Sequence, residues 1–221
     1  MNIFRNETGK TGICSIGILI MENVLNEPSK DKLLSVRQEM EGMLRAKYEN
    51  LTRGDLKALH PMDTYLSYYK KYGYTYHVLP QLESILKGKA IPGGFPLVEA
   101  MFMAEVKNML LTAGHDLDKL IEPLCLRIAT GKERFITMSG KEVTTISGDF
   151  MIMDRENIIS SILRGPDHRT AITENTERVI FTVYAPLGVE TQLVREHLED
   201  IETYVRLWNK KAITTLKIIE N

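Results

Sequence analysis

The chain has 221 residues, of which 43% are hydrophobic and 26% are charged. This is the composition of an ordinary globular protein, and it excludes disordered, collagen-like and fibrous chains. Lysine and arginine number 28 and aspartate and glutamate number 29, so the formal net charge is -1. A protein that holds nucleic acid over a large area carries a broad basic surface, so any contact with a polynucleotide is expected to be local, weak and transient. The length predicts one domain over residues 1–221.

Cysteine usage and hydropathy indicate the compartment. Cys14 and Cys125 both lie in apolar stretches, which predicts small core residues in a reducing environment; a functional thiol is the less favoured alternative. The first seven residues lack the pattern of a signal peptide. The longest apolar run, residues 12–21, is too short and too polar to cross a bilayer. We therefore expect a cytoplasmic protein with no membrane partner.

The first half of the chain predicts one strand followed by helices. In order, the expected elements are a buried strand at 13–21, an amphipathic helix that opens at Pro28–Ser29, short helices started by a Thr52–Asp55 capping box and by Pro61 with Asp63, a helix at 77–87, a loop at 88–96 and a helix at 96–111. The last of these helices is apolar nearly all round. We expect it to be buried on most sides, under strands drawn from 121–185.

The second half is rich in strands and ends in a helix. Strands are predicted at 124–128, 134–136, 150–153, 158–163 and 179–184. A final helix carries an apolar stripe from Val194 to Trp208, and residues 212–219 form either a last strand or an extension of that helix. Helices and strands are segregated, with a helix-rich part at 23–115, a strand-rich part at 116–188 and a C-terminal helix at 190–208. This order predicts an α+β fold.

Two common ligand motifs are weak or missing. Thr8–Thr11 has the Gly-Lys-Thr end of a phosphate-binding loop, but Phe4 stands where that loop needs a glycine. The five histidines have no metal-ligand spacing, so we expect neither a metal nor a cofactor. His197 lies near the apolar stripe of the last helix and is expected to be a packed core residue.

Aromatic residues are unusually dense between positions 65 and 76. Six tyrosines fall there: Tyr65, Tyr68, Tyr69, Tyr72, Tyr74 and Tyr76. They predict a helix packed by its aromatic edges, or alternatively a surface on which unpaired bases stack.

Two stretches carry groups that do chemistry. In residues 112–118, small residues allow a sharp turn, and His115 and Asp116 place a proton carrier beside a carboxylate. In residues 162–173, a glycine-proline turn follows a strand, and it concentrates phosphate-binding donors, an acceptor and an imidazole on one loop. The polar residues of that loop are Arg164, Asp167, His168, Arg169 and Thr170. The alternative for the loop is a solvated turn, and for Asp116 a cap on the segment that follows.

Together these stretches resemble a known family. The residues that carry the resemblance are Phe95–Ala100, Thr112–Leu120, Leu126–Ala129 with Gly131 and Glu133, and Ser160–Pro186 with its Gly165–Asp167 and Arg169–Thr170 pairs. They are similar to the tRNA-binding and editing domain of the phenylalanyl-tRNA synthetase beta subunit, the B3/B4 domain. The chain resembles more closely the free-standing proteins built from that domain alone. The likeness covers roughly positions 10–210.

The resemblance implies a fold and an activity. The family's fold is an antiparallel sheet region with helices packed on it. In the synthetase this domain hydrolyses tyrosine wrongly esterified to tRNA, in a pocket that here is expected between Gly93–Pro96, Gly114–Asp116 and Gly165–Thr170. This chain has Ala113 where the synthetase motif has a histidine, and the acidic residue that reads the tyrosine hydroxyl in the synthetase has no matching position here, so tyrosine specificity does not carry over. Nothing resembles the aminoacylation core, which argues against a complete phenylalanine-tRNA ligase.

Two functions follow as hypotheses. The first is a hydrolase that removes wrong amino acids from tRNA in trans; the second is a non-catalytic module that binds RNA or an amino-acid moiety. An aminoacyl ester is already activated, so positioning a water and oxyanion donors is sufficient for its hydrolysis. The expected roles are catalysis by His115, substrate binding by Gly114, Asp116, Gly165, Asp167, Thr170 and Tyr184, and RNA binding by Arg164 and Arg169.

Overall fold

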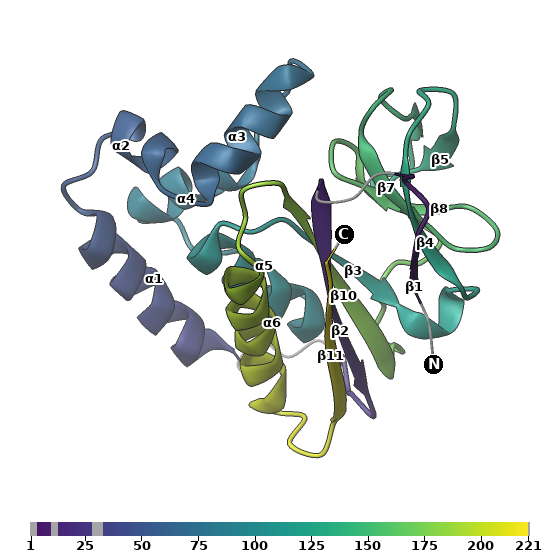
Figure 1. The fold of residues 1–221 in the computed structure, drawn as a ribbon. Coiled ribbons are helices and arrows are strands. Elements are labelled where there is room, and N and C mark those ends of the chain that lie inside the picture. Colours follow the sequence, from purple (N-terminus) through teal and green to yellow (C-terminus); the bar gives the residue numbers. More distant parts are fainter. Residues whose placement is uncertain (1–3, 10–12, 28–32, 221) are drawn as a thin grey trace.

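The computed structural model describes residues 4–9, 13–27 and 33–220. It places a layer of helices on one side of a central sheet and a second, strand-rich part on the other side (Figure 1). The fold is α+β, as the segregation of helices and strands predicts. The helices are α1 (Leu34–Tyr48), α2 (Arg53–Ala58), α3 (Met62–Lys71), α4 (Val78–Leu86), α5 (Pro96–Asn108) and α6 (Thr191–Arg206), with the 3-10 turn η1 (Leu117–Lys119).

The central sheet has four antiparallel strands. Their order is β11 (Ile213–Ile219), β2 (Cys14–Glu22), β10 (Arg178–Pro186) and β3 (Thr112–Asp116). The strands predicted near positions 13–21 and 179–184 are confirmed, and the segment near the C-terminus is a strand. β2 and β10 are buried along most of their length, because they occupy the middle of the sheet and are covered on both faces.

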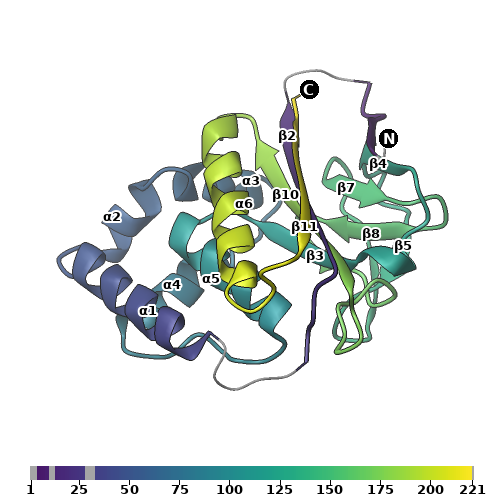
Figure 2. The ribbon, with the colours of Figure 1, turned by 90° about the horizontal axis from the view of Figure 1, so that it is seen from below.

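Helix α6 lies directly on β2 (Figure 2). The close approach depends on Gly17, because a Cβ built there would lie 2.4 Å from Val194 Cγ1. The apolar stripe of α6 faces the sheet, with Val194, Leu198 and Ile201 fully buried. His197 is buried in the same row, and its Nε2 lies 2.7 Å from Thr112 Oγ1, so it is the packed core residue that its position predicts.

Helix α5 is buried on most sides, as its apolar composition predicts. It ends at Asn108, three residues earlier than expected, because Met109 adopts a left-handed conformation with φ of 57°. Its main helical neighbour is α6, and the strand that it contacts most is β3. The strand in closest contact with α5 is therefore residues 112–116, which lie outside the expected range of 121–185.

The strand-rich part contains a second sheet and a hairpin. The sheet order is β1 (Phe4–Asn6), β4 (Leu124–Ile128), β7 (Phe150–Met153), β8 (Ile158–Ser161) and β9 (Gly165–Pro166), and the hairpin is β5 (Arg134–Ile136) with β6 (Glu142–Thr144). Tyr184 of the central sheet joins the two parts: its hydroxyl donates to Ser160 O at 3.0 Å and accepts from Ile152 N at 3.1 Å.

The sharp turn expected in residues 112–118 is wrong for the first five of these residues. The segment is strand β3, with Gly114 paired to Phe181 and His115 paired to Ile180 of β10. Glycine serves close packing here, because a Cβ at Gly114 would lie 2.9 Å from Ile172 Cδ1. The ladder to a strand more than 60 residues away overrides the local preference of small residues for a turn.

Other local expectations have clear outcomes. The Thr52–Asp55 capping box is present at the start of α2, and α3 begins directly after Pro61. The expected helix start at Pro28–Ser29 and the end of the Thr8–Thr11 motif lie outside the described residues. No helix in the described ranges is long and apolar enough to span a bilayer. Both cysteines are buried, and burial raises the pKa of Cys14 to about 12.

Candidate functional site

A pocket of about 490 Å³ opens between α3, α5, β3 and the segment that joins β8 to β9. We call it the central pocket. It is lined mainly by apolar and aromatic side chains, with a few polar groups among them. Its lining includes Tyr69, Tyr74, Thr75, His77, Val98, Met101, Phe102, Glu105, Leu111–Gly114, Met138, Ser161–Pro166, Ile172 and Tyr184. Pockets of this size and mixture hold small organic ligands.

The central pocket contains one buried carboxylate. Glu105 lies on α5 and is 1% exposed. Its Oε1 accepts a hydrogen bond from Thr112 N at 3.1 Å, which fixes the side chain against the start of β3. Its Oε2 has no hydrogen-bond partner among the described residues, and His77 Nε2 lies 3.8 Å from it. The lining of the site therefore includes a carboxylate with one buried oxygen that has no hydrogen bond among the described residues.

Aromatic rings form part of the wall around this carboxylate. Tyr69 is buried, its hydroxyl donates to Ile162 O at 2.7 Å, and its ring centroid lies 5.1 Å from that of Tyr76. The guanidinium of Arg164 lies 5.5 Å from the centre of the exposed Tyr74 ring. The buried tyrosines are thus a packed aromatic cluster, as the first of the two alternatives predicts, while Tyr74 remains accessible.

Four of the residues selected from the sequence line the central pocket: Gly114, Gly165, Arg164 and Tyr184. Gly165 has φ of +76°, a conformation that favours glycine and allows the chain to turn at the pocket edge. The Tyr184 hydroxyl is already engaged between the two sheets, so this residue offers its ring to the pocket. Residues 93–96, the third expected wall, are not part of the lining; α5 occupies that place.

His115 does not line the central pocket. It is fully buried, and its Nδ1 lies 2.8 Å from Thr170 Oγ1. The hydroxyl of Thr170 donates its only proton to Asp167. In the contact between His115 and Thr170, Nδ1 of His115 is therefore the donor and Thr170 Oγ1 the acceptor. Burial, together with the charge of Arg169, lowers the pKa of His115 to about 3. The imidazole is therefore neutral at physiological pH, and its catalytic role stays a prediction.

Asp167, Arg169 and Thr170 form a polar network that is buried except for the partly exposed Arg169. Arg169 donates to Asp154 Oδ2 at 2.8 Å and to Lys119 O at 2.9 Å, and its Nε lies 3.6 Å from Asp167 Oδ2. Asp167 accepts from Thr170 and is buried. The structure brings these residues close to His115 but not into the pocket lining.

Asp116 takes the capping role that was its alternative. Its Oδ1 accepts from Asp118 N at 3.1 Å at the start of η1, and its Oδ2 accepts from Thr176 Oγ1 at 2.8 Å. Lys119 Nζ lies 3.4 Å from the same carboxylate. All of these contacts are internal to the fold.

Sequence reasoning missed Glu105 and His77. The signal for Glu105 was present, because a carboxylate on a helix that is apolar all round must have a buried partner or a ligand. His77 precedes α4, and its side chain is 45% exposed at the edge of the pocket. Nothing in its sequence neighbourhood distinguishes it from an ordinary surface histidine.

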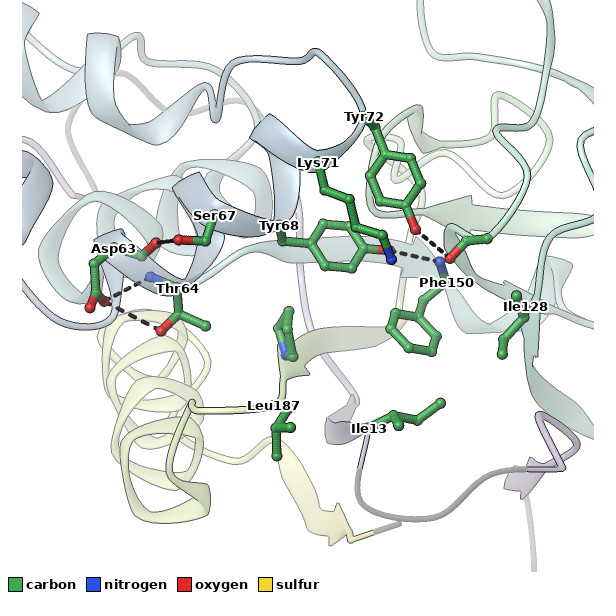
Figure 3. Close-up of a pocket in the computed structure, with 12 residues that line it drawn as sticks. Ile13, Asp63, Thr64, Ser67, Tyr68, Lys71, Tyr72, Ile128, Phe150 and Leu187 are labelled. Atoms are coloured by element: carbon green, nitrogen blue, oxygen red, sulfur yellow. Dashed lines mark hydrogen bonds between the residues drawn. The ribbon is translucent and has the colours of Figure 1, made fainter.

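A second hollow, the α3 groove, has a volume of about 560 Å³ (Figure 3). One side carries polar groups of α3, including Ser67 and Lys71, and the other side is apolar. Tyr72 donates to Gly148 O at 2.7 Å, and Tyr68 accepts from Phe150 N at 3.0 Å and donates to Asp149 Oδ1 at 2.7 Å. These bonds fix α3 on the second sheet and leave Lys71 exposed beside the groove.

No group of three or more potential ligands for a metal ion is present among the described residues. His115 and His197 are buried, and their imidazoles lie within hydrogen-bond distance of threonine hydroxyls.

Comparison with known proteins gives one family. The B3/4 domain family matches residues 101–202, which include most of α5, β3, β10 and α6 and most of the pocket lining. No curated protein matches the chain. Among solved structures, the chain is similar to an N-terminal fragment of the phenylalanyl-tRNA synthetase beta-subunit from Pyrococcus horikoshii, with 15% identity and a TM-score of 0.47. That match covers 59% of this chain and 47% of the fragment, so the chain spans about half of the fragment's length. The B3/4 domain model thus matches a little under half of this chain, over residues 101–202.

Proposed function

We propose that the protein binds the aminoacylated end of a tRNA in the central pocket and hydrolyses the aminoacyl ester in trans. The observation that carries the proposal is that the pocket's Glu105 carboxylate and Arg164 guanidinium both belong to the B3/4 segment. An amino-acid ester on RNA presents an amine, a carbonyl and nearby phosphates, and these are the groups that a carboxylate and an arginine recognise. The proposal extends the family's relation to a synthetase subunit, and contact with tRNA is expected to be weak and transient.

The chemistry needs little from the protein. An ester of an amino acid is an activated acyl group, so an oriented water and donors for the developing oxyanion supply most of the acceleration. His77 is the imidazole that lines the central pocket, and it is half-exposed. We therefore propose that His77 orients the attacking water, which is the role that the sequence suggested for His115.

A panel of mischarged tRNAs tests the proposal, with release of the amino acid measured with and without the protein. We expect faster release from at least one member of the panel, and a loss of about a hundredfold in His77→Ala because a positioned general base contributes at this level. His60→Ala is the matched control, since His60 pairs with Asp63 and Glu190 and does not line the pocket. Equal release from every tRNA with and without the protein would contradict the proposal.

The second candidate function is binding without catalysis. It is favoured by Ala113, which stands where the synthetase motif has a histidine, and by the burial of His115. Under this hypothesis the protein binds aminoacyl-tRNA, and the ester has the same lifetime in the complex as in free solution. The same panel therefore separates the two functions when binding and release are measured together.

A further inference from the structure

We propose that the central pocket selects its ligand by a primary ammonium group, which Glu105 Oε2 receives inside an aromatic wall. This inference rests on the proposed function, because it assigns the chemical group by which the bound aminoacyl moiety is recognised. The recognised group is the α-ammonium of the esterified amino acid. An ammonium on the side chain of the amino acid could bind to Glu105 in the same way.

The first argument is the state of the Glu105 carboxylate. A buried carboxylate is costly unless it is paired and hydrogen-bonded. Thr112 N satisfies only Oε1; Oε2 has no hydrogen-bond partner in the described ranges, and His77 Nε2 lies 3.8 Å from it, beyond hydrogen-bond distance. The other buried glutamate of α5, Glu99, has a full ion pair with Arg37 Nη1. One helix thus carries one glutamate satisfied by the fold and one pocket-lining glutamate whose second oxygen has no hydrogen bond in the described ranges.

The second argument is the absence of competing tyrosine donors around Oε2 in the described part of the chain. Three tyrosines lie near Glu105. Burial raises the pKa values of Tyr65, Tyr69 and Tyr76, and the negative charge of Glu105 raises them further. Each of their hydroxyls donates to a backbone carbonyl instead of to the carboxylate. These tyrosines therefore supply rings to this region, and their protons are used elsewhere.

The third argument is the kind of wall that remains. The rings of Tyr69, Tyr74 and Phe102 line the central pocket with Glu105. Aromatic faces attract cations, and a carboxylate beside them completes a site for a desolvated ammonium. Arg164 already lies over the Tyr74 ring at 5.5 Å, which shows that the wall accepts a cation at its edge. A neutral hydroxyl or amide would use the acceptor but would leave the charge of Glu105 uncompensated.

The experiment measures binding of stable amides by isothermal titration at pH 6.5, where an α-amino group is mostly protonated. The probes are L-alaninamide, L-leucinamide and L-phenylalaninamide, each compared with its N-acetyl form, which has no ammonium. Nα-acetyl-L-lysinamide carries the ammonium on the side chain only. We expect at least one free-amine probe to bind at least tenfold more tightly than its neutral counterpart. Tighter binding of the lysine probe alone would support the site and place the ammonium on the ligand's side chain.

Glu105→Gln is the test variant, because its amide oxygen still accepts from Thr112 N while the charge is removed. The variant is expected to lose the preference for the ammonium while its melting temperature stays close to that of the parent. Glu99→Gln is the matched control, since Glu99 is buried on the same helix but does not line the pocket. The inference is overturned if no amine probe binds, if the N-acetyl forms bind equally well, or if Glu105→Gln keeps the preference.

Failure of this inference and failure of the proposed function give different results. Equal hydrolysis of aminoacyl-tRNA and N-acetyl-aminoacyl-tRNA would leave the proposed function standing and overturn ammonium recognition. Ammonium-dependent binding of the amides without hydrolysis of any mischarged tRNA would support ammonium recognition and overturn the proposed hydrolysis.

Discussion

Thr170 Oγ1 lies 2.8 Å from Nδ1 of His115, and this contact joins the two stretches that carry the chemistry-bearing residues of the sequence. The same hydroxyl donates to Asp167, whose other neighbour is the guanidinium of Arg169. A chain of polar contacts therefore runs from β3 to the segment after β9 inside the protein. Because Arg169 also holds Asp154, these residues stabilise the junction between the central sheet and the strand-rich part.

The buried His115 makes stability depend on pH. Its pKa is about 3 in the folded protein against an ordinary value of 6.5 for an exposed histidine, so between these values the unfolded chain binds more protons and stability falls as pH falls. His115→Asn keeps a donor for Thr170 but cannot titrate. Between pH 7 and pH 5 we expect the parent to lose about 2 kcal/mol of unfolding free energy relative to this variant, measured by urea denaturation. Parallel pH profiles would show that His115 does not titrate differently in the two states.

The same pKa bears on catalysis. An imidazole with a pKa near 3 stays neutral down to about pH 4. If His115 is the base, we therefore expect the rate of ester hydrolysis to be constant between pH 5 and pH 7. A decline in rate below about pH 6 in the parent, retained in His115→Asn, would assign the titrating group to another residue. A decline that disappears in His115→Asn would restore His115 as the base.

The two arginines expected to bind RNA should behave differently. Arg169→Ala leaves the buried Asp154 and Asp167 without their cation, so we expect a loss of about 2 kcal/mol in unfolding free energy. Arg164 is partly exposed, and its contacts are the Tyr74 ring and Thr144 O, so Arg164→Ala should change stability by less than about 0.5 kcal/mol. Urea denaturation of both variants checks this, and an equal loss in both would refute the assignment.

Arg164 is also the arginine expected to contact tRNA. Each lost phosphate contact lowers the slope of log Kd against log salt concentration by about 0.7 to 0.9. We expect Arg164→Ala to weaken tRNA binding and to reduce this slope by about that amount, in a filter-binding titration over a range of salt. Arg195→Ala, on the exposed face of α6, is the control. If Arg164→Ala binds like the parent at low salt, the phosphate contact lies elsewhere, and Lys71 beside the α3 groove is tested next.

Close packing of α6 on the central sheet gives a stability prediction. A methyl group at Gly17 would overlap Val194 Cγ1, so we expect Gly17→Ala to cost about 1 to 3 kcal/mol. Gly42 is exposed on α1, and apart from its chain neighbours and the backbone of its own helix no described atom lies within 4 Å of the position that an added methyl would occupy, so Gly42→Ala should stabilise by up to about 1 kcal/mol. Thermal unfolding of both variants measures the difference, and a neutral Gly17→Ala would mean that α6 moves away at little cost.

Local pattern determined several features before any tertiary information. The all-round apolar composition of residues 96–111 predicts a buried helix, which the structure has over 96–108, and the Thr52–Asp55 pair predicts the start of α2; both are confirmed because such patterns depend on neighbours a few residues away. The segregation of helices and strands likewise predicts the α+β class. The motif stretches indicated a resemblance to the B3/4 domain, whose family model matches residues 101–202, because their order and spacing are properties of the chain itself.

Tertiary structure alone decided where the chemistry lies. His115 and Asp116 are conspicuous in the sequence, yet β3 pairs with β10 and places one in a buried network and the other on a cap. Glu105 is inconspicuous as one more charged residue, yet α5 directs it to the central pocket and leaves one oxygen without a partner in the described part of the chain. A strand's partner and a helix's buried face are chosen by long-range packing, and side-chain accessibility follows from that choice. Composition and spacing therefore identify the residue types, and only the packed structure determines which of them a ligand can reach.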